Sequence, residues 1–335
     1  MNIQGPQEIM HLMQGVQATG ILRTAIELGV FGEIAKGNKT ADSVAKAIGC
    51  KERATRILLD ACGALGLVEK KGSEYALPAV TEQFLVPGKP TYMGELSNLF
   101  CGDALWNSFS RLTDAVKNDG TVMHEHAETP RYHFWEMFAR STAAMAAPAA
   151  QALDGHLADF FAKRPKARVL DVAAGSGLYG FTLAKRPNVE LNVLDWPNVL
   201  VETRDWAKKL QVDASRVKYI EGNLFEVGWQ GPHDVIVMSH IFHHFDAPTC
   251  EGLMKKAAAA LAPGGRIAIH EFVYDAELKN PVAALFSITM LTTTRHGEAF
   301  GAADYSRWFE AAGLRAAGMH PSVGMPTTFL FADKP

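Results

Sequence analysis

Residues 168–195 of the chain read RVLDVAAGSGLYGFTLAKRPNVELNVLD. The segment opens with an apolar run of β-formers over residues 169–173, which is typical of a strand buried on both faces of a parallel sheet. The three glycines of GSGLYG follow, and they permit a tight turn and a close approach of the backbone to a ligand. A second predicted strand, residues 190–194, is followed by Asp195. This residue lies about as far along the chain as the acidic residue that hydrogen-bonds a ribose in nucleotide-binding folds. The segment therefore predicts an α/β unit that binds a nucleoside cofactor.

Strands continue to alternate with helices after this unit. The sequence predicts strands at residues 217–221, 234–239 and 266–272. Two more strands, residues 314–320 and 327–332, are joined by the short connection SVGMP without a helix, which indicates an antiparallel hairpin on an otherwise parallel sheet. The predicted fold class is therefore α/β, with a Rossmann-like sheet of seven strands that closes on an antiparallel strand.

A compact helical module precedes the sheet. An apolar stripe predicts a helix over residues 7–29, and two shorter helices follow at residues 41–48 and 52–65. The segment LVEKKGSEYALPA then reads as a β-hairpin, so the module is predicted to be a winged helix. Winged helices often bind DNA, but residues 1–95 carry ten Lys or Arg against ten Asp or Glu and so have no basic footprint. Dimerisation or scaffolding is favoured over DNA binding.

The segment between the module and the sheet is rich in large apolar side chains. Residues 93–162 read as two helices, interrupted by the polar run 118–129 and by Pro130. Aromatic residues and methionines at helical spacing, among them Trp135 and Phe138, commonly belong to a core. A hydrophobic substrate pocket uses the same residue types, and both interpretations remain open.

The bulk composition describes an ordinary globular protein. The 335 residues, 48% hydrophobic and 21% charged, suit more than one domain, and the predicted division is residues 1–95, 96–163 and 164–335. The net charge of -3 argues against nucleic acid as a main partner. No apolar run is long enough to span a membrane, the first residues do not resemble a signal peptide, and the four cysteines are scattered. We therefore expect a reduced, cytoplasmic protein.

The glycine motif by itself also fits a nicotinamide cofactor, because GSGLYG matches GxGxxG. Asp171, however, precedes the turn with a carboxylate that can meet a ligand amine or hydroxyl. The pattern DVAAGSG resembles the first motif of class I S-adenosylmethionine-dependent methyltransferases, and LAPGGRIAI resembles their post-sheet loop. A closing hairpin also produces the terminal antiparallel strand of that fold. In this order the features favour S-adenosylmethionine over a dinucleotide.

The chain as a whole resembles a narrower family. The segments DVAAGSG, LDWPNV, EGNLFE, SHIFHHFD, LAPGGRI and HEFV are similar to those of the small-molecule O-methyltransferases, which include plant caffeic acid and acetylserotonin enzymes and bacterial aromatic-polyketide enzymes. The resemblance implies a homodimer formed through the N-terminal module, and S-adenosylmethionine as the cofactor, with S-adenosylhomocysteine as its product and no metal. It further implies methyl transfer to a hydroxyl of a hydrophobic, aromatic small molecule in secondary metabolism.

The resemblance also assigns binding residues. Those implied to contact the cofactor are Asp171, Gly175, Gly177, Asp195, Trp196, Asn223, Leu224, Phe225 and Ser239. Those implied to line the substrate pocket are Trp135, Phe138, Met145, Phe286, Met290 and Thr294. Asn223 stands where the family usually has Asp, so the contact to the adenine amino group lacks a charge.

His243 aligns with the family's catalytic base, and Glu271 aligns with the carboxylate that orients this base. The position of a second catalytic Glu falls on Ala299, with Glu298 one residue earlier. Either the loop shifts by one residue and Glu298 serves, or Glu271 alone supports His243. The departure leaves two alternatives open: a C-methyltransferase, and a cyclase or pericyclase that binds S-adenosylmethionine without using its methyl group.

His240, His243 and His244 form the pattern HxxHH, which a metal site can also use. The segment runs from a strand end into a helix, so we expect the three rings to diverge. No cysteine or carboxylate at metal-ligand spacing accompanies them. We therefore predict no metal, and a structural His244 that caps a helix or faces solvent.

Overall fold

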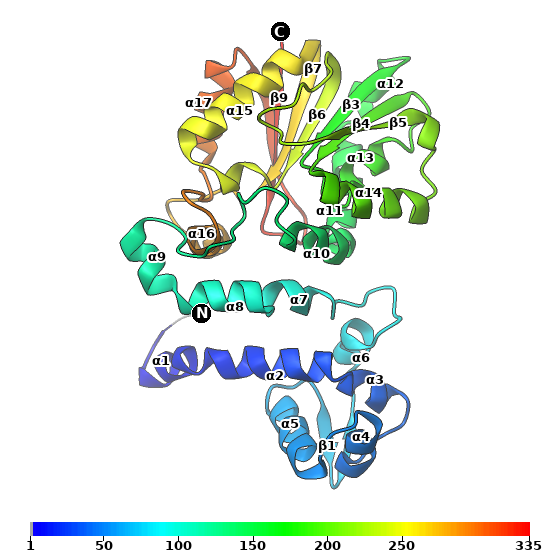
Figure 1. Ribbon diagram of the computed structural model, residues 1–335, viewed down its shortest axis with the longest axis vertical. Helices are drawn as coiled ribbons and strands as arrows, with labels where there is room; N and C mark the ends of the chain where they lie inside the picture. The colour runs from blue at the N-terminus through cyan, green and yellow to red at the C-terminus, as the bar shows by residue number, and fades with distance from the viewer. Residues whose placement is uncertain (1–2) are drawn as a thin grey trace. The chain divides into compact units, whose positions relative to one another are not determined.

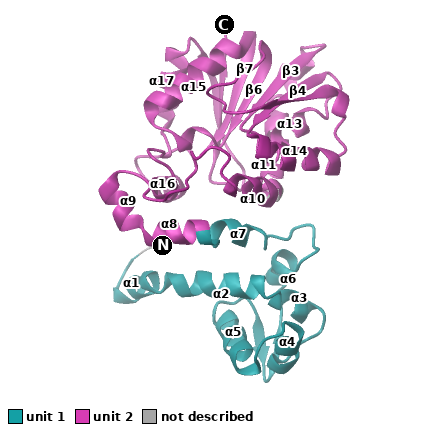
Figure 2. Cartoon of the chain, in the orientation of Figure 1, with its two compact units in different colours: residues 1–103 teal, residues 104–335 magenta. Residues whose placement is uncertain are grey.

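The structure, a computed structural model, describes residues 3–335. The chain divides into two compact units, Met1–Asp103 and Ala104–Pro335, called unit 1 and unit 2 below and coloured teal and magenta in Figure 2. The three-part division drawn from the sequence stays a prediction. Among the described residues, no helix combines the length and the apolar character that a membrane crossing needs.

Unit 1 is mostly helical. Its elements are α1 (Pro6–Met13), α2 (Gly15–Glu27), α3 (Val30–Ala35), α4 (Ala41–Ala47), α5 (Glu52–Ala64), β1 (Glu69–Lys71), β2 (Glu74–Ala76), α6 (Ala79–Leu85) and α7 (Leu96–Phe100). The two predicted short helices and the hairpin are confirmed as α4, α5 and the antiparallel pair β1–β2. The single helix predicted over residues 7–29 is wrong, because the backbone leaves helical geometry at Gln14 and a new helix begins at Gly15.

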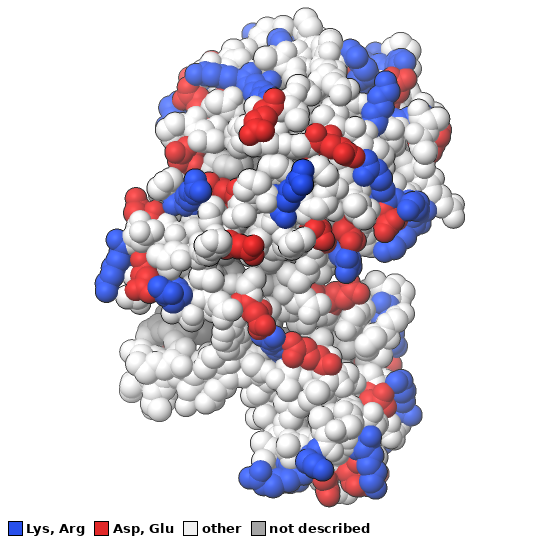
Figure 3. Space-filling view, in the orientation of Figure 1, with Lys and Arg blue, Asp and Glu red and all other residues white. Residues whose placement is uncertain are grey.

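The helices of unit 1 pack around an apolar core. Thr40 begins α4, and its hydroxyl accepts a hydrogen bond from the backbone amide three residues later at 3.2 Å. Tyr75 of β2 is 2% exposed, and its hydroxyl donates to Asp60 of α5 at 2.6 Å, which ties the hairpin to the helix. Asp60 also pairs with Lys70 and Arg56. Charges of both signs are likewise intermixed over the face shown in Figure 3.

Unit 2 begins with a series of short helices. They are α8 (Asp103–Ser110), α9 (Leu112–Asn118), α10 (Phe134–Ser141), α11 (Ala143–His156) and α12 (Ala158–Ala162). The prediction of two helices over residues 93–162 is therefore wrong. Arg111 separates α8 from α9, and Thr142 separates α10 from α11. Neither residue is Gly or Pro, so the local sequence carries no strong signal for these breaks.

The sheet of unit 2 has seven strands. They are β3 (Ala167–Val172), β4 (Val189–Asp195), β5 (Val217–Glu221), β6 (His233–Ser239), β7 (Leu261–Glu271), β8 (Arg315–Pro321) and β9 (Thr328–Asp333). Their order is β5-β4-β3-β6-β7-β9-β8, and the strands from β5 to β7 are parallel. β9 pairs antiparallel with both β7 and β8, so the predicted sheet with its closing hairpin is confirmed (Figure 1).

Helices cover both faces of this sheet. They are α13 (Leu178–Leu183), α14 (Pro197–Lys209), α15 (Ala247–Ala260) and α17 (Ala302–Ala311), together with α11. α16 (Pro281–Thr293) contributes no described residue to either core beside the sheet. α15 and α17 lie on one face, and α11, α13 and α14 lie on the other (Figure 1). Successive residues of β3 alternate between the two cores: Leu170 belongs to the core with α15, and Val169 to the core with α13. Burial on both faces explains why the strand is apolar throughout.

Gly180 allows α13 to dock closely against the sheet. A Cβ at residue 180 would lie 2.8 Å from Cδ1 of Leu191 and 2.9 Å from Oδ2 of Asp171. We expect Gly180→Ala to lower the free energy of unfolding by about 1–3 kcal/mol, because the helix or the strands must move apart. Gly252→Ala is the matched control, since residue 252 is exposed on α15 and a Cβ there meets nothing within 4 Å. Urea unfolding measures both changes, and equal losses would contradict the expectation.

Candidate active site

The candidate residues gather at one edge of the sheet of unit 2. Asp195, Ser239 and Glu271 are the last residues of β4, β6 and β7, and Asp171 is the last but one of β3. The chain order reverses between the neighbouring strands β3 and β6. In an open parallel sheet, ligands bind at the carboxyl ends of the strands where this reversal occurs.

Asp171 has a buried oxygen without a partner. The carboxylate is 0% exposed, and its Oδ2 accepts a hydrogen bond from the backbone amide of Gly180 at 2.8 Å. Its Oδ1 has no hydrogen-bond partner among the described residues. Burial raises the pKa of Asp171 to about 7. A buried acceptor of this kind requires a donor, and a cationic donor also stabilises the ionised form.

The glycine turn after β3 uses left-handed backbone conformations. The φ angles are 52° at Ala173, 56° at Gly175 and 77° at Gly177. A Cβ at Gly175 would meet nothing within 4 Å, so its backbone faces open space, whereas a Cβ at Gly177 would lie 2.5 Å from the ring of Phe181. Thr203 of α14 donates to the carbonyl oxygen of Gly175 at 2.6 Å, which holds the turn in place. Gly175 therefore suits close approach to a ligand, and Gly177 is also required by packing.

Asp195 links the end of β4 to the glycine turn. Its Oδ2 accepts from the amide of Gly175 at 2.8 Å, and its Oδ1 accepts from the amide of Trp196 at 2.7 Å. The residue is 8% exposed, and burial raises its pKa to about 6. Each carboxylate oxygen keeps a lone pair, so the group can still accept from two hydroxyls of a ribose.

The loop after β5 is organised by Asn223. Its Oδ1 accepts from the backbone amide of Phe225 at 3.0 Å, and its Nδ2 donates to Glu226 at 3.0 Å. Leu224 is half-buried, and Phe225 is 40% exposed and packs edge-on to Phe245 at 4.9 Å between ring centroids. The amide side chain therefore shapes its own loop, and the contact of this loop with an adenine stays a prediction.

His243 and Glu271 form a buried pair. Nδ1 of His243 lies 2.7 Å from Oε2 of Glu271, and the two side chains are 5% and 0% exposed. The carboxylate also accepts from the backbone amides of Phe242 at 3.0 Å and Phe272 at 3.2 Å. An ionised carboxylate can only accept hydrogen bonds, so with Glu271 ionised Nδ1 of His243 donates and its Nε2 carries the free lone pair.

The protonation of this pair follows from its burial. Burial lowers the pKa of His243 to about 3, so the imidazole is neutral at pH 7. Burial also raises the pKa of Glu271. The carboxylate and the imidazole act on each other in the opposite sense, because a nearby anion favours the imidazolium. We conclude that the imidazole is held in the state that accepts a proton at Nε2.

The loop of residues 294–299 lies behind this pair. A Cβ at Gly297 would lie 2.3 Å from the carbonyl oxygen of His243, so the two segments are in close contact. Glu298 is exposed, and no hydrogen bond or ion pair joins it to His243 in the part of the chain that the structure describes. Ala299 is buried, and its amide donates to Ser287. Of the two sequence alternatives, the geometry favours support of His243 by Glu271 alone.

Aromatic rings surround the buried pair. Phe286 of α16 packs edge-on to His243 at 4.7 Å between ring centroids, and Phe272 stacks on Phe286 at 4.1 Å. Trp135 of α10 packs edge-on to His244 at 5.1 Å and to Phe138 at 5.5 Å. The predicted pocket aromatics, Trp135 and Phe138 of α10 and Phe286 of α16, therefore lie beside the histidine segment.

The other predicted pocket residues differ in how available they are. Met145 is half-buried, whereas Met290 is 5% exposed and Thr294 is 0% exposed. The hydroxyl of Thr294 donates to the carbonyl oxygen of Met290 at 2.8 Å and accepts from the amide of Gly297 at 2.8 Å. Both polar functions of this hydroxyl serve the fold of the loop, so its assignment to the substrate pocket gains no support.

The sequence predicted that the three rings of the HxxHH histidines diverge. This prediction is wrong for His240 and His243. Nδ1 of His240 lies 3.9 Å from the same Glu271 oxygen that bonds His243. His240, His243 and Glu271 each offer one atom that could bind a metal ion, and these three atoms lie within 4.8 Å of one another. His244 is 9% exposed, which rules out the predicted solvent-facing position, and Asp246 provides the cap of α15 instead. Sequence spacing missed the convergence, because Glu271 belongs to another strand and His240 has a left-handed φ of 53°.

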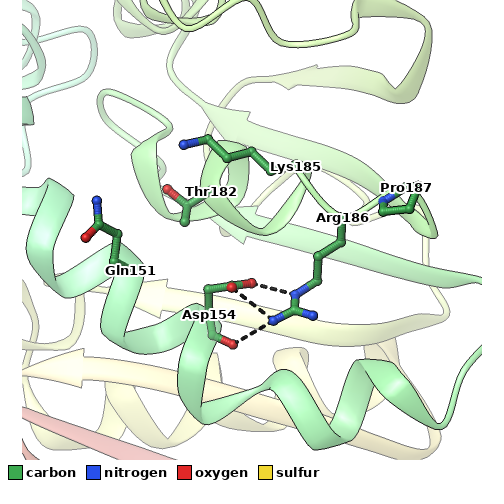
Figure 4. Close-up of a pocket in the computed structure, with 6 residues that line it drawn as sticks. All are labelled: Gln151, Asp154, Thr182, Lys185, Arg186 and Pro187. Atoms are coloured by element: carbon green, nitrogen blue, oxygen red, sulfur yellow. Dashed lines mark hydrogen bonds and ion pairs between the residues drawn. The ribbon is translucent and has the colours of Figure 1, made fainter.

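A hollow elsewhere in unit 2 is unrelated to these residues. It has a volume of about 480 Å³ and is lined by Gln151, Asp154, Thr182, Lys185, Arg186 and Pro187 (Figure 4). Two of its three charged residues, Asp154 and Arg186, already pair at 2.6 Å. Arg186 lies just before the amino end of β4, whereas Asp195 lies at the carboxyl end. The hollow therefore opens at the edge opposite to the candidate site.

Comparisons with known proteins agree with this geometry. The model of the O-methyltransferase domain matches residues 109–315, and the model of the O-methyltransferase dimerisation domain matches residues 10–87. The 3-hydroxy-5-methyl-1-naphthoate 3-O-methyltransferase of Streptomyces sahachiroi is 30% identical over 92% of this chain and 89% of its own length.

Two solved structures have the same fold along nearly the whole chain. The crystal structure of a candidate O-methyltransferase from Nostoc punctiforme has a TM-score of 0.92 and 30% identity, covering 99% of this chain and 100% of that one. Human N-acetylserotonin methyltransferase in complex with S-adenosylmethionine has a TM-score of 0.84 and 20% identity, covering 99% and 98%. The family resemblance drawn from the sequence is thereby confirmed. The chain belongs to the S-adenosylmethionine-dependent O-methyltransferase family.

Proposed function

We propose that the protein transfers the methyl group of S-adenosylmethionine to a hydroxyl of a hydrophobic, aromatic small molecule, with His243 as the general base. The observation that carries this proposal is the buried hydrogen bond between His243 and Glu271 at the carboxyl edge of the sheet. It leaves Nε2 of a neutral imidazole as a proton acceptor beside the residues that fit the cofactor. The dimerisation domain supports assembly as a homodimer.

The residues at this edge fit the cofactor. Oδ1 of Asp171 is a buried acceptor without a partner, and the α-ammonium group of S-adenosylmethionine is a donor with the complementary charge. Asp195 suits the ribose hydroxyls, and Gly175 leaves open space for the methionyl part. When bound, the cofactor supplies an electrophilic methyl group on a sulfonium. We assign Trp196, Asn223, Leu224, Phe225 and Ser239 to its remaining contacts, and Gly177 to the turn.

His243 can accept the proton that the acceptor hydroxyl loses. A phenol has a pKa near 10 and free histidine about 6.5, a difference worth roughly 5 kcal/mol in the ground state, and the burial that lowers the pKa of His243 makes this proton transfer more costly still. Glu271 offsets part of this cost, because it stabilises the imidazolium that forms. It also fixes the direction in which Nε2 points. The base therefore acts by accepting the hydroxyl proton as charge develops on the acceptor oxygen.

The aromatic surroundings support an aromatic acceptor. Phe286 packs on His243 and Trp135 packs on His244, and Phe138 extends this apolar ring surface. Such surfaces favour a flat, apolar ring system with few polar groups. The relative from Streptomyces sahachiroi is named for a hydroxyl on a naphthoate ring, which is of this class.

Replacement of the proposed base tests the reaction. We expect His243→Ala to lower kcat by about 10²- to 10⁴-fold, because a positioned base contributes on this scale. The affinity for S-adenosylhomocysteine, measured by calorimetry, should stay within a few-fold of the wild type. Turnover is measured by methylation of a panel of hydroxylated naphthalenes, with the product position read by NMR. An unchanged kcat would remove His243 as the base, and a new carbon–methyl bond would identify a C-methyltransferase.

Replacement of the supporting carboxylate separates the two glutamates. We expect Glu271→Gln to lower kcat by roughly 10²-fold or more, since an amide can hold the imidazole in the wrong tautomer. Glu298→Gln is the matched control and should keep kcat within a few-fold. The opposite ranking in steady-state kinetics would mean that the loop of residues 294–299 moves in the working enzyme.

The affinity for the cofactor should depend on pH through Asp171. The ionised carboxylate binds the ammonium group, so binding lowers a pKa that burial has raised to about 7. Affinity is then greatest above pH 7 and falls as the pH decreases, by up to about tenfold per unit for one proton. Calorimetric titration of S-adenosylhomocysteine between about pH 5.5 and about pH 7.5 measures this dependence. Asp171→Asn should abolish the transition near pH 7, and its persistence in that variant would assign it to another group.

A further inference from the structure

We propose that His240, His243 and Glu271 form a binding site for a divalent transition-metal ion such as Zn²⁺, and that the bound ion switches off methyl transfer. The ion is an inhibitor in this proposal and takes no part in the reaction. Its binding stands on the geometry alone, whereas its inhibitory effect rests on the proposed role of His243.

The three ligand atoms are already close to the required geometry. Nδ1 of His243 and Nδ1 of His240 lie 2.7 Å and 3.9 Å from Oε2 of Glu271. The three residues each offer one ligand atom, a ring nitrogen or a carboxylate oxygen, within 4.8 Å of the other two. Zinc bonds of about 2.0–2.2 Å in a tetrahedral arrangement place ligand atoms about 3.3 Å apart. The two printed distances to Oε2 of Glu271 lie on either side of this spacing, so binding requires the rings of His240 and His243 to adjust. The side chain of His240 is 25% exposed, which gives it room to rotate and gives an ion access from outside.

The chemistry of the set suits zinc, nickel and copper. Two imidazoles and one carboxylate are preferred ligands of these ions, and the fourth position is left for water or an acceptor oxygen. Glu271 is fully buried, and among the described residues it has ion-pair contacts only with the two histidines, and none with a Lys or Arg. A divalent cation supplies the positive charge that this carboxylate lacks.

The backbone at His240 supports a specific role for its side chain. Its φ of 53° lies in the left-handed region, which is unfavourable for a residue with a Cβ. The conformation is held by the amide of His240, which donates to the carbonyl oxygen of His270 at 2.9 Å. It turns the ring toward Glu271, where the ring also packs edge-on to His270 at 4.8 Å between centroids.

Inhibition follows from the tautomer of His243. In the metal-free protein the proton is on Nδ1 and the free lone pair is on Nε2. An ion that bonds Nδ1 displaces that proton, and the neutral imidazole then carries its proton on Nε2. The ring gains no net charge, no electrons are transferred, and the hydrogen bond to Glu271 is replaced by metal–ligand bonds. Nε2 becomes a donor and can no longer accept the proton of a hydroxyl.

The test compares the full-length protein with a variant that lacks one ligand. His240→Asn removes the imidazole, while Asn tolerates the left-handed backbone. Chelator-treated protein is titrated with Zn²⁺ against a chromogenic chelator, and with Co²⁺ for the absorption bands of a tetrahedral complex. We expect one ion per chain in the wild type and an affinity at least about tenfold lower in His240→Asn, because the loss of a ligand exceeds a typical outer-shell effect. The zinc concentration that halves kcat should rise by the same factor.

A second variant controls for adventitious binding. His320 is exposed and stacks on His156 at 4.7 Å, so His320→Asn removes a surface histidine outside the site. This variant should bind and respond to zinc as the wild type does. Equal zinc affinity in His240→Asn and the wild type would overturn the metal site, whereas zinc-free kinetics of His243→Ala independently test the proposed base. Zinc that binds through His240 without reducing kcat would overturn the inhibitory effect.

Discussion

The buried carboxylate of Glu271 is the group on which the geometry of the site depends. At 0% exposure an ionised carboxylate is costly unless donors surround it. Two of its donors are the backbone amides of Phe242 and Phe272, and the third is the imidazole of His243. The segment after β6 must therefore lie against the end of β7, where Glu271 is located. The hydrogen bond that satisfies the buried charge of Glu271 also sets the orientation of His243.

The same edge of the sheet collects negative charge that the protein itself does not neutralise. Asp171, Asp195 and Glu271 are all buried there, and among the described residues none of the three pairs with a Lys or Arg. Burial raises the pKa of each carboxyl group. A raised pKa in the folded protein means that ionisation of these groups opposes folding as the pH rises through the ordinary pKa of a carboxyl group. A cationic ligand relieves this cost, so cofactor binding and stability are coupled at this edge.

The strands and the site edge could be predicted in some detail, and the helix breaks could not. A strand buried on both faces leaves a continuous apolar run, so β5 was predicted residue for residue and the other strands of this sheet to within about two residues at their ends, except that β7 begins at Leu261 and not at the predicted residue 266. The breaks at Gln14, Arg111 and Thr142 occur at residues that are ordinary helix formers or nearly so. Helix propensity alone therefore did not predict these breaks.

A similar division holds for the site. The order of the motifs was sufficient to identify the family and the cofactor class, and to propose His243 as the base, because each motif follows a strand end and parallel strands bring those ends together. Three-dimensional packing was needed to favour support of His243 by Glu271 without Glu298, to direct the hydroxyl of Thr294 into its own loop, and to bring His240 beside Glu271. These outcomes depend on contacts between distant segments and on a left-handed residue, and neither leaves a periodic signal in the sequence.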